Sequence, residues 1–379
     1  MRYDAIVVGA GPAGSYAAYL LAKQGVAVAL LDRVAFPREK PCGGALSRKA
    51  LDLVRLDLSP VIHGHVTGAW LAHGERAVFC DTRGVAAGMT LRTELDAFLL
   101  EHAVKAGARF HPETSFLDVE TNGGEVRVAT SRGELTGRLL LAADGVASAV
   151  RRRVFGADVV EYAPAAEALV HAPPAIVARF GDRVLLDLAG MPGGYGWIFG
   201  KRDHLNVGVY SIGGRGGIRG HLAAFLARHP SLGRADRIRY LGHPIPVANR
   251  ARRFERGPVW LLGDAAGLAE CILGEGIYFA LKSATLAARA FLAPAVRAYT
   301  RLLEDEVLPE LAAAEHLARA CYAHPRFLFE RIARSRYASR LFLGVVTGEV
   351  GYRQCLLGSL ATVPRWLLSA RADVAALTV

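Results

Sequence analysis

The feature that most constrains the fold of this chain is its N-terminal segment, YDAIVVGAGPAGSYAAYLLAKQGVAVALLDR, residues 3–33. Apolar runs at residues 5–8 and 26–31 predict two buried strands, and the residues between the glycine-rich turn and about residue 24 predict a helix. A strand, turn, helix and strand in this order is the opening unit of an α/β fold with a Rossmann-type sheet.

The glycines of this segment are spaced for dinucleotide binding. In the G-x-G-x-x-G pattern, the first glycine permits a tight turn, the second lets a pyrophosphate approach the backbone, and the third lets helix pack on strand. The helix N-terminus would then hold the phosphates, and an acid at the end of the second strand would bind ribose hydroxyls. The residues expected to hold the dinucleotide here are Gly9, Gly11, Ala13, Gly14, Asp32 and Arg33.

Length and charge set outer bounds on function. A chain of 379 residues predicts two or three structural units. Its net charge of +11 is scattered rather than gathered in a run, so we expect no nucleic-acid partner. Residues 316–379 are the most basic part and also carry aromatic residues such as Phe327 and Trp366. This leaves open a peripheral contact with an anionic membrane, with a solvated helical face as the alternative.

The cysteines and histidines predict neither disulfides nor a metal site. The five cysteines are an odd number and form no C-x-x-C pair, so reduced thiols in a cytoplasmic protein are expected. His63 and His65 lack a third nearby ligand and are typical of a polar loop. The apolar start is too short for a signal peptide, and the segment from Ile277, which carries Lys282 and Arg289, predicts an amphipathic helix rather than a membrane span.

Three further motifs resemble those of the para-hydroxybenzoate hydroxylase-like superfamily of flavoproteins. VWLLGDAAGL, with Gly263 and Asp264, resembles its second flavin fingerprint, and LLLAADGVASAVRR, with Asp144 and Gly145, resembles its third short motif. LRTELDAFLLEHA resembles the helix whose leading arginine, here Arg92, reaches the cofactor. The resemblance implies that FAD is the bound dinucleotide.

Because the FAD motifs are far apart in sequence, we expect a binding domain assembled from separate segments. The resemblance and the alternating polar and apolar residues between the motifs predict a mixed or antiparallel substrate domain, followed by a helical region. The expected division is an FAD-binding domain of residues 1–60, 88–156 and 250–295, a substrate domain of 61–87 and 157–249, and a C-terminal helical region of 296–379.

Three stretches narrow the resemblance to the geranylgeranyl reductases: PCGGALS, PGGYGWIFGKRDHLNVGVYS and GLAECILGEGIYFALKSA. The resemblance implies hydride transfer from reduced flavin to carbon–carbon double bonds of a prenyl or similar apolar small molecule or lipid, and leaves open whether NADPH or ferredoxin supplies electrons. It also implies that these loops contribute further cofactor-binding residues, namely Cys42, Gly43, Gly44, Gly274, Gly276 and Ile277.

The chain departs from that family's pattern at three places. Gly200 replaces a proline, Ala45 replaces a third glycine, and residues 270–273 replace a segment normally written N-P-x-T. These changes put the identity of the substrate in doubt, whereas the flavin site is expected to be retained. An FAD-dependent monooxygenase of an aromatic or polyketide-like substrate remains the alternative; the W-x-W-x-I-P signature of flavin halogenases is absent from the sequence.

Tyr195, Trp197 and Phe199 recur at period two, so one face of a strand would present three aromatic rings. The resemblance favours rings that line a substrate cavity, with packing in a domain core as the alternative. We assign Tyr195 and Trp197 as catalytic candidates and all three as substrate-binding residues.

Two cysteines complete the candidate site. The resemblance implies that Cys42 and Cys271 both lie near the flavin ring, with Cys271 standing where the family has proline. A thiol can donate the proton that alkene reduction needs, so Cys42 is the catalytic candidate for proton delivery or cavity gating. Cys271 is expected to contact substrate or fill space, and each thiol has the alternative of being a small buried apolar group.

Overall fold

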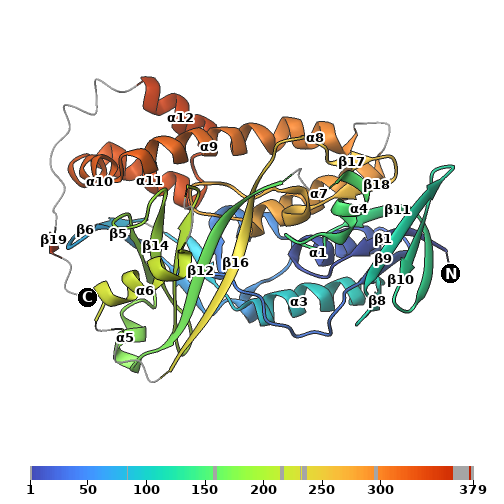
Figure 1. Ribbon diagram of the computed structural model, residues 1–379, viewed down its shortest axis with the longest axis horizontal. Helices are drawn as coiled ribbons and strands as arrows, with labels where there is room; N and C mark the ends of the chain where they lie inside the picture. The colour runs from blue at the N-terminus through green and yellow to red at the C-terminus, as the bar shows by residue number, and fades with distance from the viewer. Residues whose placement is uncertain are drawn as a thin grey trace. The chain divides into compact units, whose positions relative to one another are not determined.

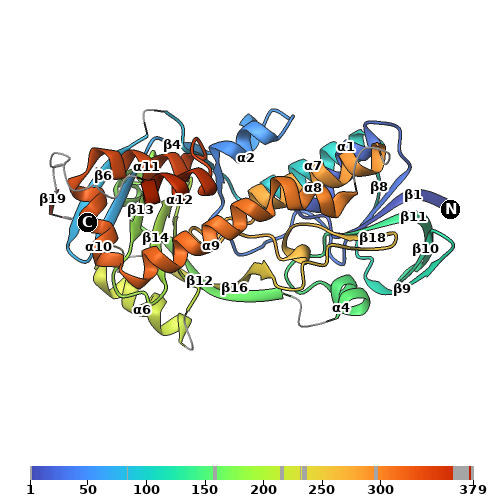
Figure 2. The same ribbon diagram turned by 90° about the horizontal axis from the view of Figure 1, so that it is seen from above.

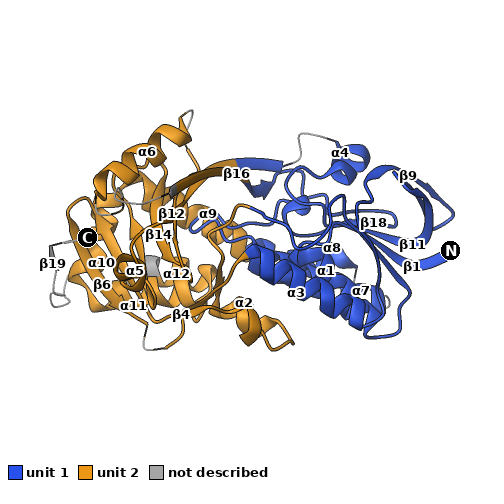
Figure 3. Cartoon of the chain, turned by 90° about the horizontal axis from the view of Figure 1, so that it is seen from below, with its two compact units in different colours: residues 1–40, 92–162, 245–309 blue, residues 41–91, 163–244, 310–379 orange. Residues whose placement is uncertain are grey.

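The computed structural model describes residues 2–82, 84–156, 160–213, 217–230, 232, 237–293, 298–361 and 375–376 (Figure 1). Its contacts divide the chain into two compact units, which we describe separately (Figure 3). Unit 1 comprises residues 1–40, 92–162 and 245–309, and unit 2 comprises residues 41–91, 163–244 and 310–379.

Unit 1 contains a mainly parallel sheet. Its strands are β1 (Arg2–Val8), β2 (Val28–Leu31), β8 (Arg109–His111), β9 (Phe116–Asn122), β10 (Glu125–Thr130), β11 (Gly133–Ala142), β17 (Glu255–Arg256) and β18 (Val259–Leu261). The order is β17-β18-β11-β1-β2-β8, with β18, β11, β1, β2 and β8 parallel and the β9–β10 hairpin attached to β11. The continuous apolar runs of β1 and β2 are buried, as expected for parallel strands with both faces covered.

Helices cover this sheet. They are α1 (Pro12–Ala22), α3 (Arg92–Lys105), α4 (Ala149–Phe155), α7 (Ile277–Leu292) and α8 (Tyr299–Glu306), with the 3-10 helix η3 (Gly263–Ala266) after β18. Helix α1 packs against both α3 and α7 (Figure 3). The predicted N-terminal strand, helix and strand, and the helix predicted from Ile277, are therefore confirmed.

Unit 2 contains a mostly antiparallel sheet of its own. Its strands are β5 (Gly68–His73), β6 (Arg76–Asp81), β12 (Val160–His171), β13 (Arg183–Asp187), β14 (Gly194–Gly200), β15 (Leu205–Ser211), β16 (Arg237–Asn249) and β19 (Ala375–Ala376). The order is β16-β12-β15-β14-β13-β5-β6-β19, and β12 and β16 contain unit boundaries. A small second sheet joins β3 (Ala45–Ser47), β7 (Ala87–Met89) and β4 (Gly64–Val66).

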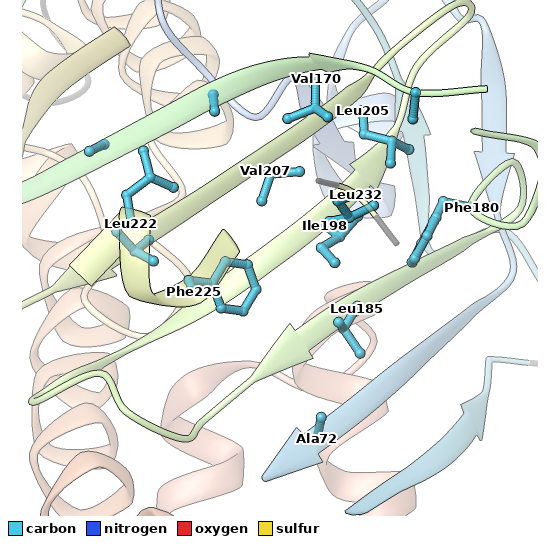
Figure 4. Packing of buried hydrophobic residues seen from close by; sticks show 14 of the residues in the cluster. Ala72, Val170, Phe180, Leu185, Ile198, Leu205, Val207, Leu222, Phe225 and Leu232 are labelled. Atoms are coloured by element: carbon cyan, nitrogen blue, oxygen red, sulfur yellow. The ribbon is translucent and has the colours of Figure 1, made fainter. Parts of the chain in front are cut away.

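The two faces of the unit 2 sheet are packed differently. One face carries an aliphatic cluster that includes Ile198, Leu205 and Val207 and is covered by Leu222 and Phe225 of α6 (Ile218–Arg228) (Figure 4). The short helix α5 (Pro174–Ala178) also contributes to this cluster. The opposite face is therefore left for the alternate residues of β14, which are Tyr195, Trp197 and Phe199.

The C-terminal helices belong to unit 2. They are α9 (Leu308–Ala323), α10 (Pro325–Arg334), α11 (Arg336–Thr347) and α12 (Tyr352–Ala361), and they accompany the earlier α2 (Arg48–Leu53) and the 3-10 helix η1 (Ser59–Val61). Helices α10 and α11 lie on the other side of the sheet from α6 (Figure 2). Phe329 of α10 contacts the ring of His73 in β5, and Ser339 of α11 bonds Cys80 of β6.

This division differs from the three parts expected from the sequence. Residues 41–60 belong to unit 2 because β3 pairs with β7, rather than to the FAD-binding domain. Residues 298–309 belong to unit 1, where Tyr299 stacks on Trp260 and donates to the Leu261 carbonyl. The rest of the C-terminal region is part of unit 2 instead of a separate body, because its helices pack on β5 and β6.

Among the described helices, none is both long enough and apolar enough to cross a bilayer.

Candidate functional site

In unit 1, four predicted motifs meet at one edge of the sheet. Strands β18, β11, β1 and β2 are adjacent and parallel, so their carboxyl ends lie side by side. The segments that follow these strands carry Gly263 and Asp264, Asp144 and Gly145, the glycine loop from Gly9, and Asp32. Ligands of open α/β sheets bind at this edge, so the arrangement fits the predicted dinucleotide site.

The glycine loop tolerates no side chain at two of its positions. A Cβ on Gly14 would lie 1.8 Å from the Gly9 carbonyl oxygen, and a Cβ on Gly9 would lie 2.4 Å from the Ala143 carbonyl oxygen. Gly9 also has a φ of 99°, which favours glycine. Gly11 is different, because the nearest atom to its Cβ position is a guanidinium nitrogen of Arg38, at 3.4 Å. The backbone of α1 can therefore approach a phosphate at Gly11 with a cation beside it.

Asp32 ends β2 with its carboxylate directed back to the loop. Its Oδ2 accepts the Ala10 N–H at 2.8 Å, and its Oδ1 accepts the Val34 N–H at 3.2 Å. Each carboxylate oxygen can accept a second hydrogen bond, so Asp32 can bind ribose hydroxyls and fix the loop together. Arg33 is exposed, and Arg38 is the arginine that lies beside the glycine loop.

Arg92 begins α3 and is held in place by a buried acid. Its Nε and a terminal nitrogen bond the two carboxylate oxygens of Asp96 at 2.7 and 2.8 Å. A terminal nitrogen of Arg38 lies 3.2 Å from the same carboxylate. Two guanidinium groups thus share one carboxylate, and the surplus positive charge suits an anionic ligand such as pyrophosphate.

Asp264 lies in η3, and Lys40 Nζ is 3.2 Å from its Oδ2. A Cβ on Gly276 would lie 3.2 Å from Asp264 Oδ1, so the Gly274–Ile277 segment, which starts α7, comes close to this carboxylate. Gly276 is the N-cap of α7 and has no side chain to cap it. The predicted residues Asp264, Gly274, Gly276 and Ile277 are therefore brought together.

Asp144 has a different neighbourhood from Asp264. Its carboxylate accepts the Ser148 hydroxyl and the amides of Ala149 and Val150, so it caps the N-terminus of α4. Burial raises the pKa of this carboxyl, while these hydrogen bonds act in the opposite direction. Its position in the motif is explained by helix capping in this structure, and Gly145 permits the turn with a φ of 78°.

Arg151 follows on α4 and joins two of the motifs. It is almost fully buried, and it donates to the carbonyl oxygens of Ala265 at 2.9 Å and Val146 at 2.7 Å. The segment containing Asp144 is thereby tied to the segment containing Asp264. This arginine stands in the LLLAADGVASAVRR motif, from which no role for it was predicted.

Residues 270–276 are organised by Glu270. Its buried carboxylate accepts the amides of Ile272, Leu273 and Glu275 at 2.6 to 2.9 Å. Cys271 is also buried, and its thiol donates to the Val247 carbonyl oxygen over 3.8 Å. Where the family has N-P-x-T, this chain therefore has an acid, Glu270, that binds the backbone amides of its own loop.

In unit 2, the three predicted aromatic residues share one face of β14. The register pairs Trp197 with Gly208 of β15, and Gly208 with Glu167 of β12, so the Trp197 ring has room above Gly208. A Cβ on Gly208 would lie only 2.1 Å from that ring. Trp197 Nε1 donates to Asn206 Oδ1 at 2.7 Å, and the rings of Tyr195 and Trp197 lie 5.9 Å apart.

The Pro41–Gly44 loop packs on the same face. A Cβ on Gly43 would lie 2.9 Å from the Phe199 ring and 3.7 Å from Trp197 Nε1. Cys42 donates its N–H to Glu167 Oε1 at 3.0 Å, and Gly44 donates its N–H to Cys42 Sγ at 3.4 Å. The thiol and the aromatic rings, predicted separately, are therefore neighbours within unit 2.

Lys201 immediately follows β14 and is buried beside this loop. Its Nζ donates to the carbonyl oxygens of Gly44 at 3.0 Å and Thr90 at 3.1 Å. Burial lowers the pKa of Lys201 to about 8, and the charges of Cys42 and Glu167 oppose that shift. The sequence analysis missed Lys201 and Glu167; the quoted stretch GKRDH contains the lysine, but only the sheet register could place Glu167 beside the thiol.

Comparisons with known proteins agree with this geometry. Residues 2–163 match a family model described as an FAD binding domain. The chain is 34% identical to a chloroplast geranylgeranyl diphosphate reductase of Oryza sativa subsp. japonica over 81% of this chain and 70% of that protein. It is 29% identical to a menaquinone reductase of Mycolicibacterium smegmatis over 95% and 90% of the two chains.

A solved structure shares the fold. It is a geranylgeranyl bacteriochlorophyll reductase-like protein from Thermoplasma acidophilum, with a TM-score of 0.76, 22% identity, and coverage of 97% of this chain and 98% of that one. The glycine cradle, Asp32 and the arginine pair at Asp96 fit FAD, which is the cofactor. The chain belongs to the geranylgeranyl reductase family of FAD-dependent oxidoreductases.

Proposed function

We propose that this protein hydrogenates carbon–carbon double bonds in the isoprenoid chain of a small molecule or lipid. The observation that carries the proposal is the packing of the Cys42 loop on the aromatic face of β14, because a thiol that could donate a proton then lies beside rings suited to an apolar chain. The family relatives support the same reaction class.

The chemistry divides between cofactor and protein. Reduced FAD supplies the hydride when it is bound. The rings of Tyr195, Trp197 and Phe199 would hold the isoprenoid chain and exclude water, and the Cys42 thiol would give a proton to the second carbon. Residues in unit 1 would bind FAD through the glycine loop, Asp32, the arginine pair and Asp264.

The substrate's isoprenoid chain is better supported than its head group. One relative is named for geranylgeranyl diphosphate and another for menaquinone, and both compounds carry isoprenoid chains. The structure gives a reason for one departure from the family pattern: a Cβ at Gly200 would lie 2.2 Å from the Phe180 carbonyl oxygen. The backbone next to Phe199 is therefore packed more closely than a proline would allow, which would alter the shape offered to the substrate.

Peripheral membrane contact remains part of the proposal. Phe327 of α10 is 61% exposed, with the Arg331 guanidinium 5.7 Å from its ring, and Tyr337 of α11 is 41% exposed. Phe329 is buried and cannot take part, and Trp366 lies outside the described residues. Arginines beside exposed rings would favour vesicles with anionic lipid, and equal binding to neutral and anionic vesicles would contradict the idea.

The reaction is tested with protein reduced by dithionite in the absence of oxygen. Geranylgeranyl diphosphate and menaquinone are supplied separately, and mass spectrometry measures a gain of two hydrogens for each reduced bond. Hydrogenation of either compound supports the proposal. Failure with both, together with oxygen-dependent hydroxylation of an aromatic compound, would favour the monooxygenase alternative.

A cysteine variant tests the proton donor. Cys42→Ala should retain FAD and lower the hydrogenation rate by on the order of 10²-fold, the usual contribution of general acid catalysis. Cys321→Ala, which removes a partly buried thiol from α9, is the matched control and should keep the rate. A Cys42→Ala protein with the wild-type rate would remove the thiol from the reaction.

A further inference from the structure

Two buried charged residues in unit 2 have no part in the chemistry described so far. Lys201 is 7% exposed and Glu167 is 5% exposed. Burying a charged group is costly unless partners compensate for the lost water. Their partners indicate what these residues do.

Each of the two residues has a partner in the segment Cys42–Gly44. Glu167 accepts the N–H of Cys42 at 3.0 Å, while Lys201 donates to the carbonyl oxygen of Gly44 at 3.0 Å. Glu167 therefore binds the first residue of this segment through its N–H, and Lys201 binds the last residue through its carbonyl oxygen. Lys201 Nζ also donates to Thr90 O and lies 3.6 Å from Met89 Sδ, which fixes the lysine to the end of β7.

The ammonium and the thiol have a common neighbour in Gly44. Gly44 contacts both groups, because its amide donates to Cys42 Sγ and its carbonyl accepts from Lys201. The charged and titratable groups that act on Lys201 are Cys42 and Glu167; Asp203 and His204, on the same turn, are paired with each other. With its pKa lowered to about 8 by burial, Lys201 still carries a proton at pH 7 and can release it near neutral pH.

We propose that Lys201 and Glu167 are positioning residues that act through Cys42: Glu167 orients the loop, and Lys201 stabilises the thiolate and returns a proton to it. This inference rests on the proposed function. The Cys42 S–H bond would break and leave its electron pair on sulfur, while the proton forms a C–H bond at one alkene carbon with the π electron pair; reduced flavin, when bound, would supply the hydride for the C–H bond at the other carbon. A Lys201 N–H bond then breaks as the S–H bond re-forms, and the amine regains its proton from water.

The proposal is tested first without turnover, by the rate at which iodoacetamide alkylates Cys42 in the oxidised holoenzyme. Peptide mass spectrometry separates Cys42 from the other four cysteines. Lys201→Met should slow alkylation at pH 7.5 by about ten-fold, because the positive charge that stabilises the developing negative charge of the thiol is lost. Retained FAD absorbance shows that the variant is folded.

A second variant fixes the sign of the effect. Glu167→Gln keeps an oxygen that can accept the Cys42 N–H but removes a negative charge, so alkylation at pH 7.5 should be faster. Lys282→Met, which removes a largely buried ammonium from α7 in unit 1, is the control and should leave the alkylation rate unchanged. Unchanged rates in both Lys201→Met and Glu167→Gln, or changes in the same direction, would overturn the proposal.

The rate of hydrogenation gives the second readout. The wild-type kcat should fall as the pH rises through about 8, because Lys201 loses the proton that it returns to Cys42. Lys201→Met should have a lower kcat, and its kcat should not fall as the pH rises through about 8. If that fall persists in the variant, Lys201 does not return the proton to Cys42. If alkylation behaves as expected but no isoprenoid is reduced, only the proposed function fails, and the reverse result removes only the Lys201 role.

Discussion

The glycine loop of unit 1 and the Pro41–Gly44 loop of unit 2 are both tight, glycine-containing turns, but different interactions hold them. The first is confined mainly by backbone atoms, since Gly9 faces the Ala143 carbonyl and Gly14 faces Gly9 itself, with Asp32 accepting one loop amide. In the second, Glu167 and Lys201, which are remote in sequence, bond Cys42 and Gly44, and backbone confinement is greatest at Gly44, which faces the Thr90 carbonyl.

This difference has a consequence for substitution. A loop held by backbone contacts cannot relax, because carbonyl groups of a parallel sheet and its helix have fixed positions. A loop held by side chains can adjust, since rings and long side chains change rotamer at small cost. We therefore expect cofactor binding to be sensitive to single methyl groups in unit 1 and catalysis to be tuned by charge in unit 2.

The largest effect is expected from Gly14→Ala. The added Cβ would meet the Gly9 carbonyl oxygen at 1.8 Å, which forces α1 away from β1 and disrupts the phosphate site. FAD affinity should fall by on the order of 10²-fold, about 3 kcal/mol, measured by flavin retained after desalting and by titration of the apoprotein.

Gly43→Ala is the matched test in the other loop. Its Cβ would meet the Phe199 ring at 2.9 Å, and a ring can move, so FAD retention should stay close to wild type. Gly220→Ala, in open space on α6, controls for the added methyl group. Equal loss of FAD in Gly14→Ala and Gly43→Ala would remove the distinction between the two loops.

The same contrast explains what could be predicted from the sequence. The glycine loop and Asp32 could be proposed from the sequence because their spacing follows from a local strand, turn and helix, and Asp264 because its motif resembles a flavin fingerprint. Glu167 could not be found in this way, because its place beside Cys42 depends on the pairing of β12 with β15. The assignment of residues 41–60 to the FAD-binding domain failed for a related reason, since the β3–β7 pairing joins segments about 40 residues apart.

An intermediate effect is expected at Glu270, an acid in unit 1 that orders a loop as Glu167 does in unit 2. Glu270→Gln keeps one acceptor oxygen for the amides of Ile272, Leu273 and Glu275 but directs an NH₂ group at one of these donors. The free energy of unfolding should drop by about 1–3 kcal/mol, measured by denaturant titration, because a buried amide loses its partner.

Glu275→Gln provides the control for Glu270, because it removes a neighbouring carboxylate that is not the acceptor of these three bonds. Because Glu275 is only partly buried, the free energy of unfolding should fall less than in Glu270→Gln. If Glu270→Gln lowers the free energy of unfolding no more than Glu275→Gln does, the Glu270 carboxylate is not what holds this loop, and the comparison with Glu167 fails.

The smallest effect is expected at Cys271, the thiol of unit 1, in contrast to Cys42 of unit 2. The Cys271 thiol is buried and donates a long bond, 3.8 Å, to the Val247 carbonyl oxygen. Cys271→Ala removes this weak bond and one small atom, so the free energy of unfolding should fall by about 1 kcal/mol or less. FAD retention and the hydrogenation rate should stay near wild type, whereas Cys42→Ala retains FAD and loses the rate. If Cys271→Ala is as slow as Cys42→Ala, the assignment of proton donation to Cys42 alone is wrong. The Glu270 loop of unit 1 would then also take part in catalysis.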